Sequence, residues 1–313
     1  MVSSPDVTVV IPTLNRPVLV TRAVRSALDQ TFRNLEVVVV VDGPDEATHE
    51  ALAALGDDRL RVQEQPERGG APAARNAGVR AARGEFVAFL DDDDEWLPGK
   101  LQAQVDLARS GKVETPIVIT KLFVRTPRTE FVLPRRLPDP GEPLSEWLTV
   151  RKGPFHGDGF IQTSTIMAPT ALLTEVPFKE DLRRLQEMDW SLRALSRDGV
   201  DLLIVDEPLV VWYADENRPR ISDDAPIRAS LAWLRGVRPL VTRRAYAALA
   251  MTQVSSMAAQ SHSPKVFGKL LYESVRYGRP GVRDVVTFAQ IWLVPTRVRR
   301  VVRDRLIARR GGH

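Results

Sequence analysis

Four consecutive carboxylates, Asp91 to Asp94, are the residues of this chain whose type and spacing most clearly suggest chemistry. They follow an apolar, strand-like run at 85–90 and precede 95–98, where a helix could begin. Such a cluster concentrates more negative charge than a fold tolerates unless a positive group binds there. Carboxylate oxygens suit Mg²⁺ or Mn²⁺, and Mg²⁺ usually shares its site with substrate phosphates. The run therefore predicts metal-assisted handling of a phosphorylated substrate, with a solvated acidic turn as the alternative.

The elements that must position these carboxylates alternate in type along the first hundred residues. Short apolar strands separated by helices imply a mostly parallel sheet with right-handed crossovers, so the expected fold class is α/β, a Rossmann-like sheet flanked by helices. Thr13, Asn15, Arg16, Asp42 and the acidic run all lie just past strand ends and should converge on one crevice. The expected strands are 7–11, 35–41, 60–62 and 85–90. One expected helix begins at Pro17, and three more cover about 46–55, 71–82 and 98–109.

The later part of the chain follows a less regular pattern. A strand is expected at 160–167, a helix at 182–197, and closing strands at 202–205 and 209–212. From about residue 225 the pattern is helical.

Composition limits the class of protein. With 313 residues, 43% apolar content and six Trp, the chain can bury a large core in one domain or a domain with an appendage. The absence of cysteine excludes disulfides and thiolate zinc sites and fits a reducing compartment. We expect no signal peptide and no bilayer-spanning segment, and therefore a cytoplasmic location.

Charge is distributed unevenly along the chain. Residues 228–313 hold 17 Lys and Arg against three acids, a balance of +14, so with a net charge of +4 the rest of the chain carries 4 − 14 = −10. We expect a domain at 1–220, with halves at about 1–110 and 111–220, and a basic helical region at 221–313. Apolar residues and arginines interleave at 291–306. This pattern is typical of a helix lying in an anionic membrane surface, here the inner face of the plasma membrane. A helix packed on the catalytic domain or on a second subunit would show the same pattern. Nucleic acid is not an expected partner, because no recognition motif accompanies the charge.

Six segments in order resemble family 2 glycosyltransferases, the inverting sugar transferases of GT-A fold. The resemblance covers about residues 6–215 and implies a nucleotide-sugar donor site followed by an acceptor site. The matching segments are 7–16, 27–31, 40–43, 73–78, 84–98 and 185–190.

The resemblance assigns donor-binding roles to residues of the first half. It implies that Thr13, Asn15 and Asp42 hold the nucleotide base and ribose, with Arg16 in the same site. It implies that Arg75 and Asn76, at a Gly-rich helix start, meet the diphosphate. Asp93 is the best candidate metal ligand, joined by Asp91, while Asp91 and Asp92 lie nearer the ribose and bridging waters. The alternatives are an ordinary Asp-Gly-Pro turn at Asp42 and a helix-surface arginine at Arg75.

The resemblance also assigns the acceptor side. The position of the general base, usually Asp in the family, holds Glu187, whose extra methylene displaces the carboxylate by about an ångström. Asp189 is the second candidate, but two residues on along a helix it faces another way. Trp190 and His156 are candidate acceptor contacts. Trp190 would look the same as a core aromatic. His156, in a Gly-rich loop, could also touch the metal or the diphosphate, but a loop histidine more often does neither.

The implied function is a metal-dependent inverting glycosyltransferase of cell-surface polysaccharide or glycolipid synthesis. Its implied partners are a UDP-, GDP- or dTDP-sugar, a carbohydrate or lipid-linked acceptor, Mn²⁺ or Mg²⁺, and a membrane surface or second subunit. An inactive nucleotide-sugar-binding scaffold is one alternative. A nucleotidyltransferase is the other, but it would need a Gly-rich loop directly after the first strand, where this chain has 12–16.

Overall fold

The computed structural model describes residues 4–127, 129–153, 158–214, 227–259 and 263–294. Its chain contacts divide it into two compact units, residues 1–137 with 159–224, and residues 138–158 with 225–313. We call these the sheet unit and the helical unit.

The sheet unit is built on one mixed sheet. Its strands run in the order β3, β2, β1, β4, β8, β6, β9, β5, with β7 paired to β6. The first four strands are parallel, as expected, whereas β8 runs antiparallel to β4 and β6. The strands are β1 (Val7–Thr13), β2 (Leu35–Val41), β3 (Leu60–Glu64), β4 (Phe86–Phe89), β5 (Glu95–Trp96), β6 (Thr115–Arg125), β7 (Glu130–Leu133), β8 (Met167–Pro169) and β9 (Val200–Tyr213).

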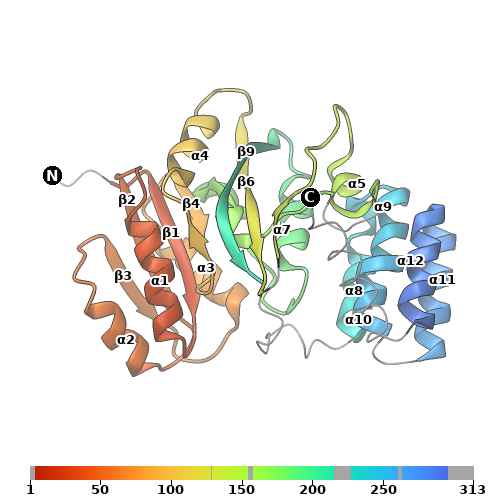
Figure 1. The fold of residues 1–313 in the computed structure, drawn as a ribbon, viewed down its shortest axis with the longest axis horizontal. Helices are drawn as coiled ribbons and strands as arrows, with labels where there is room; N and C mark the ends of the chain where they lie inside the picture. Colours follow the sequence, from red (N-terminus) through yellow and green to blue (C-terminus); the bar gives the residue numbers. More distant parts are fainter. Residues whose placement is uncertain (1–3, 128, 154–157, 215–226, 260–262, 295–313) are drawn as a thin grey trace. The chain divides into compact units, whose positions relative to one another are not determined.

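Helices flank this sheet, which confirms the α/β fold class (Figure 1). Pro17 occupies the first turn of α1, where its missing N–H costs nothing, and a buried apolar stripe of that helix faces the sheet. Asp45 caps α2 by accepting from the Thr48 amide at 3.2 Å. The helices are α1 (Pro17–Leu28), α2 (Glu46–Ala53), α3 (Ala71–Ala81), α4 (Lys100–Ala108), α6 (Thr170–Glu175) and α7 (Gln186–Ala194).

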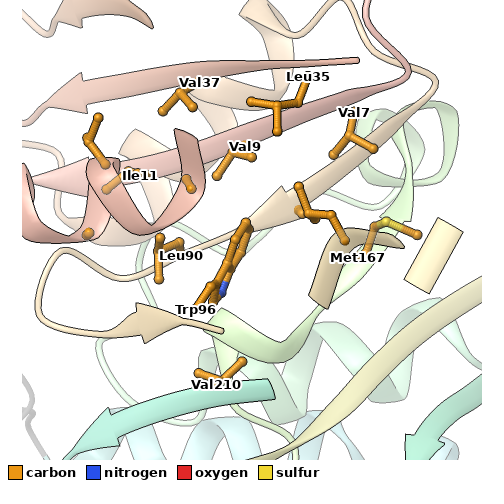
Figure 2. Packing of buried hydrophobic residues seen from close by; sticks show 14 of the residues in the cluster. Val7, Val9, Ile11, Leu35, Val37, Leu90, Trp96, Met167 and Val210 are labelled. Carbon is orange, nitrogen blue, oxygen red and sulfur yellow. The ribbon is translucent and has the colours of Figure 1, made fainter. Parts of the chain in front are cut away.

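The core of the sheet unit forms between strands and helices. The central strands β1 and β2 are buried along their whole length, which is why they read as continuous apolar runs rather than as an alternating pattern. Figure 2 shows Trp96 between Leu90 and Val210, in a cluster that continues through the valines of β1 and β2. The strand ends that follow this rigid core are therefore held in place.

Helix α3 lies unusually close to the sheet. A Cβ atom at Gly78 would lie 2.3 Å from Cγ1 of Val10 in β1, so only glycine permits this approach. The close contact fixes the height of α3 and of the arginine that it carries.

One expected strand forms a different structure. The expectation of a strand at 160–167 was wrong in most of its length, because Thr163–Thr165 is a 3₁₀ turn and β8 begins only at Met167. The Gln162 side chain accepts from the Ser164 amide at 2.7 Å and caps this turn.

The helical unit contains a bundle, which confirms the helical C-terminal region. A buried Glu273 on α11 is bonded by Arg235 of α8, at 2.6 Å, and by the Tyr246 hydroxyl of α9, at 2.8 Å. Of the stretch 291–306, in which apolar residues and arginines interleave, 291–293 lie in α12, and 295–306 lie outside the described residues. The elements are α5 (Leu144–Thr149), α8 (Ile227–Gly236), α9 (Arg243–Ala248), a π-helical turn (Leu249–Val254), α10 (Ser255–Ala258), α11 (Pro264–Tyr277) and α12 (Val282–Leu293). No helix within the described ranges is long and apolar enough to cross a membrane.

Candidate active site

The site is built at the carboxyl ends of β1, β2 and β4. Thr13, the last residue of β1, donates from Oγ1 to Oδ2 of Asp92 at 2.8 Å. Arg16 approaches Asp92 Oδ1 at 3.0 Å and Asp93 Oδ2 at 3.5 Å. The structure thus brings together the first and fourth strand ends, as the topology predicts for parallel neighbours.

Asp92 is the most deeply buried member of this group that retains an arginine partner. Burial raises its pKa to about 6, the Arg16 charge opposes that rise, and the neighbouring Asp93 charge adds to it. The pKa of Arg16 is affected in turn: burial lowers it, but Asp92 and Asp93 outweigh burial and the net shift is upward. The acidic run is therefore partly offset by an arginine of the chain itself.

A second arginine approaches the run from α3. Arg75 donates to Asp91 Oδ1 at 2.7 Å and to Gln186 Oε1 at 2.6 Å, and its side chain is only 5% exposed. Gln186 is the first residue of α7, the helix that carries Glu187. Arg75 therefore joins the acidic run to the helix of the candidate base.

Asp94 is fully buried at the base of the site. Its Oδ2 accepts from Gln162 Nε2 at 2.8 Å and pairs with the Ser164 hydroxyl at 2.6 Å, while Oδ1 has no partner among the described residues. Burial raises the pKa of Asp94 well above its ordinary value, and the charges of Asp91 and Asp93 raise it further. Burial and the neighbouring charges therefore both favour the neutral form of Asp94.

Glu187 lies in the first turn of α7 and is half-buried. The Thr163 hydroxyl donates to its Oε1 at 2.7 Å. Leu185 directly precedes α7. Its φ is 61°, in the left-handed region that a leucine rarely adopts. Such an unfavourable backbone conformation is common where a functional side chain must be aimed.

Asp42 directly follows β2 and so lies beside Thr13, at the carboxyl end of the neighbouring strand β1. Its two carboxylate oxygens accept from the amides of Gly69 and Gly70, at 2.8 and 2.9 Å. Gly70 has a φ of 84° at the start of α3, so a side chain there would be strained. Asp42 thus shapes the Gly-rich entry to α3 and lies next to the Thr13 end of the site.

Two other predicted site residues make hydrogen bonds outside the acidic run. The Asn15 backbone N–H donates to Asp45 Oδ2 at 2.7 Å. The Asn76 side chain bonds both backbone polar atoms of Phe178, each at 2.9 Å, and so anchors that segment.

Asp189 and Trp190 point into the protein rather than toward Glu187. Asp189 is 1% exposed, with Lys179 at 2.8 Å and Arg193 at 2.7 Å. Trp190 is fully buried, donates to the Val176 carbonyl at 2.8 Å and stacks on a phenylalanine, so it has the place of a core aromatic. His156 lies outside the described residues.

Sequence reasoning missed the residues that hold the carboxylates. Gln162, Thr163 and Ser164 contact Asp91, Asp94 and Glu187, and the signal for them was a polar run inside an expected strand. Arg22 was missed as well: it donates to the Asp93 carbonyl at 2.6 Å and lies 4.3 Å from the Tyr213 ring centre. That helix-borne arginine gave no signal of its own in the sequence.

The donor set is compatible with a divalent cation shared with a diphosphate. Within the described ranges, no three His, Asp or Glu side chains gather into a ready metal site. Mg²⁺ and Mn²⁺ need only one or two carboxylates when phosphates and waters complete their shell. Asp91 and Asp93, whose side chains are 24% and 29% exposed, offer such oxygens.

Comparisons with known proteins relate this site to glycosyltransferases. The model of glycosyl transferase family 2 matches residues 8–146 of the chain. Among curated relatives, the chain is 28% identical to the amylovoran biosynthesis glycosyltransferase AmsB of Erwinia amylovora, over 75% of this chain and 79% of the relative. It is 37% identical to the GalNAc(5)-diNAcBac-PP-undecaprenol beta-1,3-glucosyltransferase of Campylobacter jejuni, over 34% of this chain and 36% of that protein, so it spans only about a third of that relative's length.

Solved structures share the fold. TarS of S. aureus, residues 1–349 in complex with UDP-GlcNAc, superposes with a TM-score of 0.56 at 18% identity, over 94% of this chain and 82% of that one. The mannosyltransferase PcManGT from Pyrobaculum calidifontis, in complex with GDP-Man and Mn²⁺, superposes with a TM-score of 0.54 at 18% identity. The superposition covers 92% of this chain and 74% of the mannosyltransferase. At this level of identity the likeness establishes the fold alone.

Proposed function

We propose that this chain transfers a sugar from a nucleoside-diphosphate-sugar to an acceptor hydroxyl, with inversion at the anomeric carbon and with a divalent cation. One observation carries the proposal: Arg75 bonds both Asp91 of the acidic run and Gln186, the residue next to Glu187. Arg75 thereby joins the acidic run to the helix that carries the half-buried Glu187, and a transfer between two bound substrates requires such groups to be held close together.

The donor side of the proposal uses the strand ends. Asp42 and Thr13 lie at adjacent strand ends, where a base and ribose would be recognised by hydrogen bonds. Arg75 would meet the diphosphate, because guanidinium pairs with phosphate oxygens. Asp91 and Asp93 would hold Mn²⁺ or Mg²⁺, which supplies charge neutralisation for the departing diphosphate. The mannosyltransferase neighbour, whose complex contains GDP-Man and Mn²⁺, supports a metal in this role.

The acceptor side depends on Glu187. In this proposal Glu187 takes the proton of the acceptor hydroxyl, whose oxygen forms a bond to the anomeric carbon while the bond to the diphosphate oxygen breaks. The Thr163 hydroxyl, 2.7 Å from Oε1, holds the carboxylate in position and leaves it able to accept the proton. A single displacement of this kind inverts the anomeric configuration.

The relatives support a proposal for the acceptor class. One relative is named for synthesis of the polysaccharide amylovoran and another for an acceptor linked through a diphosphate to undecaprenol. On this support we propose that the chain works in polysaccharide or glycolipid synthesis, acts on a carbohydrate or lipid-linked acceptor, and takes a peripheral position at a membrane. The neighbours carry both UDP- and GDP-sugars, so both nucleotides belong in the test.

The test is thermal unfolding of the purified protein with UDP-, GDP- and dTDP-sugars, each with Mn²⁺, Mg²⁺ or EDTA. A ligand that binds only the native state raises the unfolding temperature by mass action. We expect one nucleotide class to raise it, only with metal, and Asp93→Ala to abolish the rise. Asp181→Ala is the matched control, since that exposed aspartate lies outside the site. A rise that persists in EDTA would contradict the metal requirement, and no rise under any condition would favour an inactive scaffold.

A further inference from the structure

Exposed apolar side chains of the described residues gather on two helices of the helical unit. Ten large hydrophobic side chains are exposed in the described parts of the chain, and seven of them lie between residues 271 and 293. We call these seven the outer patch: Leu271, Tyr272, Val275, Val282, Val285, Val286 and Leu293.

Helix α12 has an unusual arrangement of polar and apolar residues. Val282 and Leu293 are 81% and 77% exposed, and with Val286 they follow the spacing of one helix face. The opposite face buries Asp284 and Thr287 beside Phe288. A helix on a protein surface ordinarily presents its polar residues to water, so an outward valine stripe indicates that something apolar covers it.

The patches of the two helices form one surface. Helices α11 and α12 run side by side in the helical unit (Figure 1). Phe267 of α11 packs against Phe288 and Trp292 of α12, with ring centres 4.9 and 5.4 Å apart. The helical spacing places Leu271 and Val275 on the outward side of this aromatic contact.

The exposed charges of residues 264–294, which carry the outer patch, all have one sign. The two acids of this stretch are buried within the unit: Glu273 is bonded by Arg235 and Tyr246, and Asp284 by Arg244. The exposed charged residues of 264–294 are all basic: Lys265, Lys269, Arg276, Arg279 and Arg283. By sequence, residues 295–313 add seven arginines, at 297, 299, 300, 303, 305, 309 and 310, against one aspartate at 304.

We propose that the outer patch is a docking surface for an anionic lipid bilayer. Outward apolar side chains flanked only by basic ones match the chemistry of an acyl boundary below anionic head groups. A second copy of the chain is a poorer occupant, because a two-fold contact would bring two sets of like charges together. Docking would bring the chain to a lipid-linked acceptor, and this purpose alone rests on the proposed function.

The test is sedimentation of the full chain with vesicles of phosphatidylcholine alone or with phosphatidylglycerol. We expect binding only to the anionic vesicles, weakened by salt. Val282→Asp is expected to weaken it about tenfold, because it removes apolar burial and adds repulsion. Val18→Asp is the matched control, since Val18 on α1 is 80% exposed and lies in the sheet unit; it should bind like wild type.

Three results would overturn the proposal. The first is no binding, or equal binding to neutral vesicles. The second is unchanged binding by Val282→Asp, which would assign the contact to another part of the chain such as 295–313. The third is a dimer in sedimentation velocity that Val282→Asp dissociates in the absence of lipid. Donor-induced thermal shifts of the same variants separate this proposal from the proposed function: Val282→Asp should keep its donor shift, and Asp93→Ala should keep its vesicle binding.

Discussion

Two carboxylates two residues apart on α7 have opposite surroundings. Glu187 is half-buried with one hydroxyl partner, Thr163, whereas Asp189 is 1% exposed between Lys179 and Arg193. A base must exchange a proton with a substrate, while a carboxylate held between two cations in the interior stabilises the fold. The geometry therefore supports Glu187 as the catalytic candidate and gives Asp189 a structural role.

Glu187→Gln should separate chemistry from stability. Because the amide cannot take a proton, we expect kcat to fall about 10²- to 10⁴-fold, with an unchanged donor-induced thermal shift. Asp189→Ala is the contrasting variant: it leaves two cations without their buried partner and should lower the free energy of unfolding by about 3 kcal/mol. Steady-state kinetics and denaturant unfolding of both variants test this. Equal kinetics for Glu187→Gln and wild type would refute the base assignment.

The raised pKa of Asp92 predicts how the free energy of unfolding depends on pH. This pKa is raised from 3.8 to about 6 by burial, so the folded state binds the proton more tightly than the unfolded state. Stability is then greatest below the unfolded pKa and is lost as pH rises through the folded one, by at most about 3 kcal/mol. We expect the difference in unfolding free energy between Asp92→Asn and wild type to shift in favour of the variant from about pH 4 to 6, then level off. Denaturant unfolding in EDTA measures it, and a constant difference would count against the raised pKa.

At the scale of elements, two contacts set the position of Arg75. Helix α3 approaches β1 through Gly78, and Asp42 holds the Gly69 and Gly70 amides at the start of that helix. The arginine therefore reaches Asp91 and Gln186 because its helix is fixed at two points.

Gly78→Ala should disturb this element. The new Cβ would lie 2.3 Å from Val10, which forces α3 outward and should cost about 1–3 kcal/mol of stability. Val10→Ala in the same chain should recover part of that loss, because it removes the clashing methyls. Gly99→Ala is the control, since its Cβ would meet nothing within 4 Å. Thermal unfolding of these three variants beside wild type measures the losses, and a Gly78→Ala protein as stable as wild type would show that the contact is not tight.

The elements also show what sequence patterns can predict. Buried parallel strands have long apolar runs, so β1, β2 and β4 and the polar residues at their ends were predictable. The turn at 163–165 was not, because its structure depends on Gln162, whose side chain bonds Ser164, Asp91 and Asp94 across the fold. Trp190 could not be assigned either, since only tertiary packing distinguishes a core aromatic from an exposed one.

At the scale of the whole molecule, the site residues and the outer patch belong to different units. All the residues of the candidate active site lie in the sheet unit, and all those of the outer patch lie in α11 and α12. Units with separate cores can respond separately to their ligands.

Hydrogen exchange should report this separation. We expect a donor sugar nucleotide with metal to slow amide exchange near the ends of β1 and β4 and at the start of α3, because those amides border the donor site. Exchange in 264–293 should stay unchanged until anionic vesicles are added. Mass spectrometry of peptides from both units measures it; slowing of 264–293 by the nucleotide alone would mean that the two units respond as one.

The outward valines of α12 have a practical consequence for anyone handling the protein. A surface that is apolar and basic adsorbs to chromatography resins, plastic and air bubbles, and it draws copies together as concentration rises. We expect recovery during purification to improve when a mild detergent occupies those valines, and Val282→Asp to improve it without detergent. The same substitution that removes a docking surface would then give the better crystallisation sample.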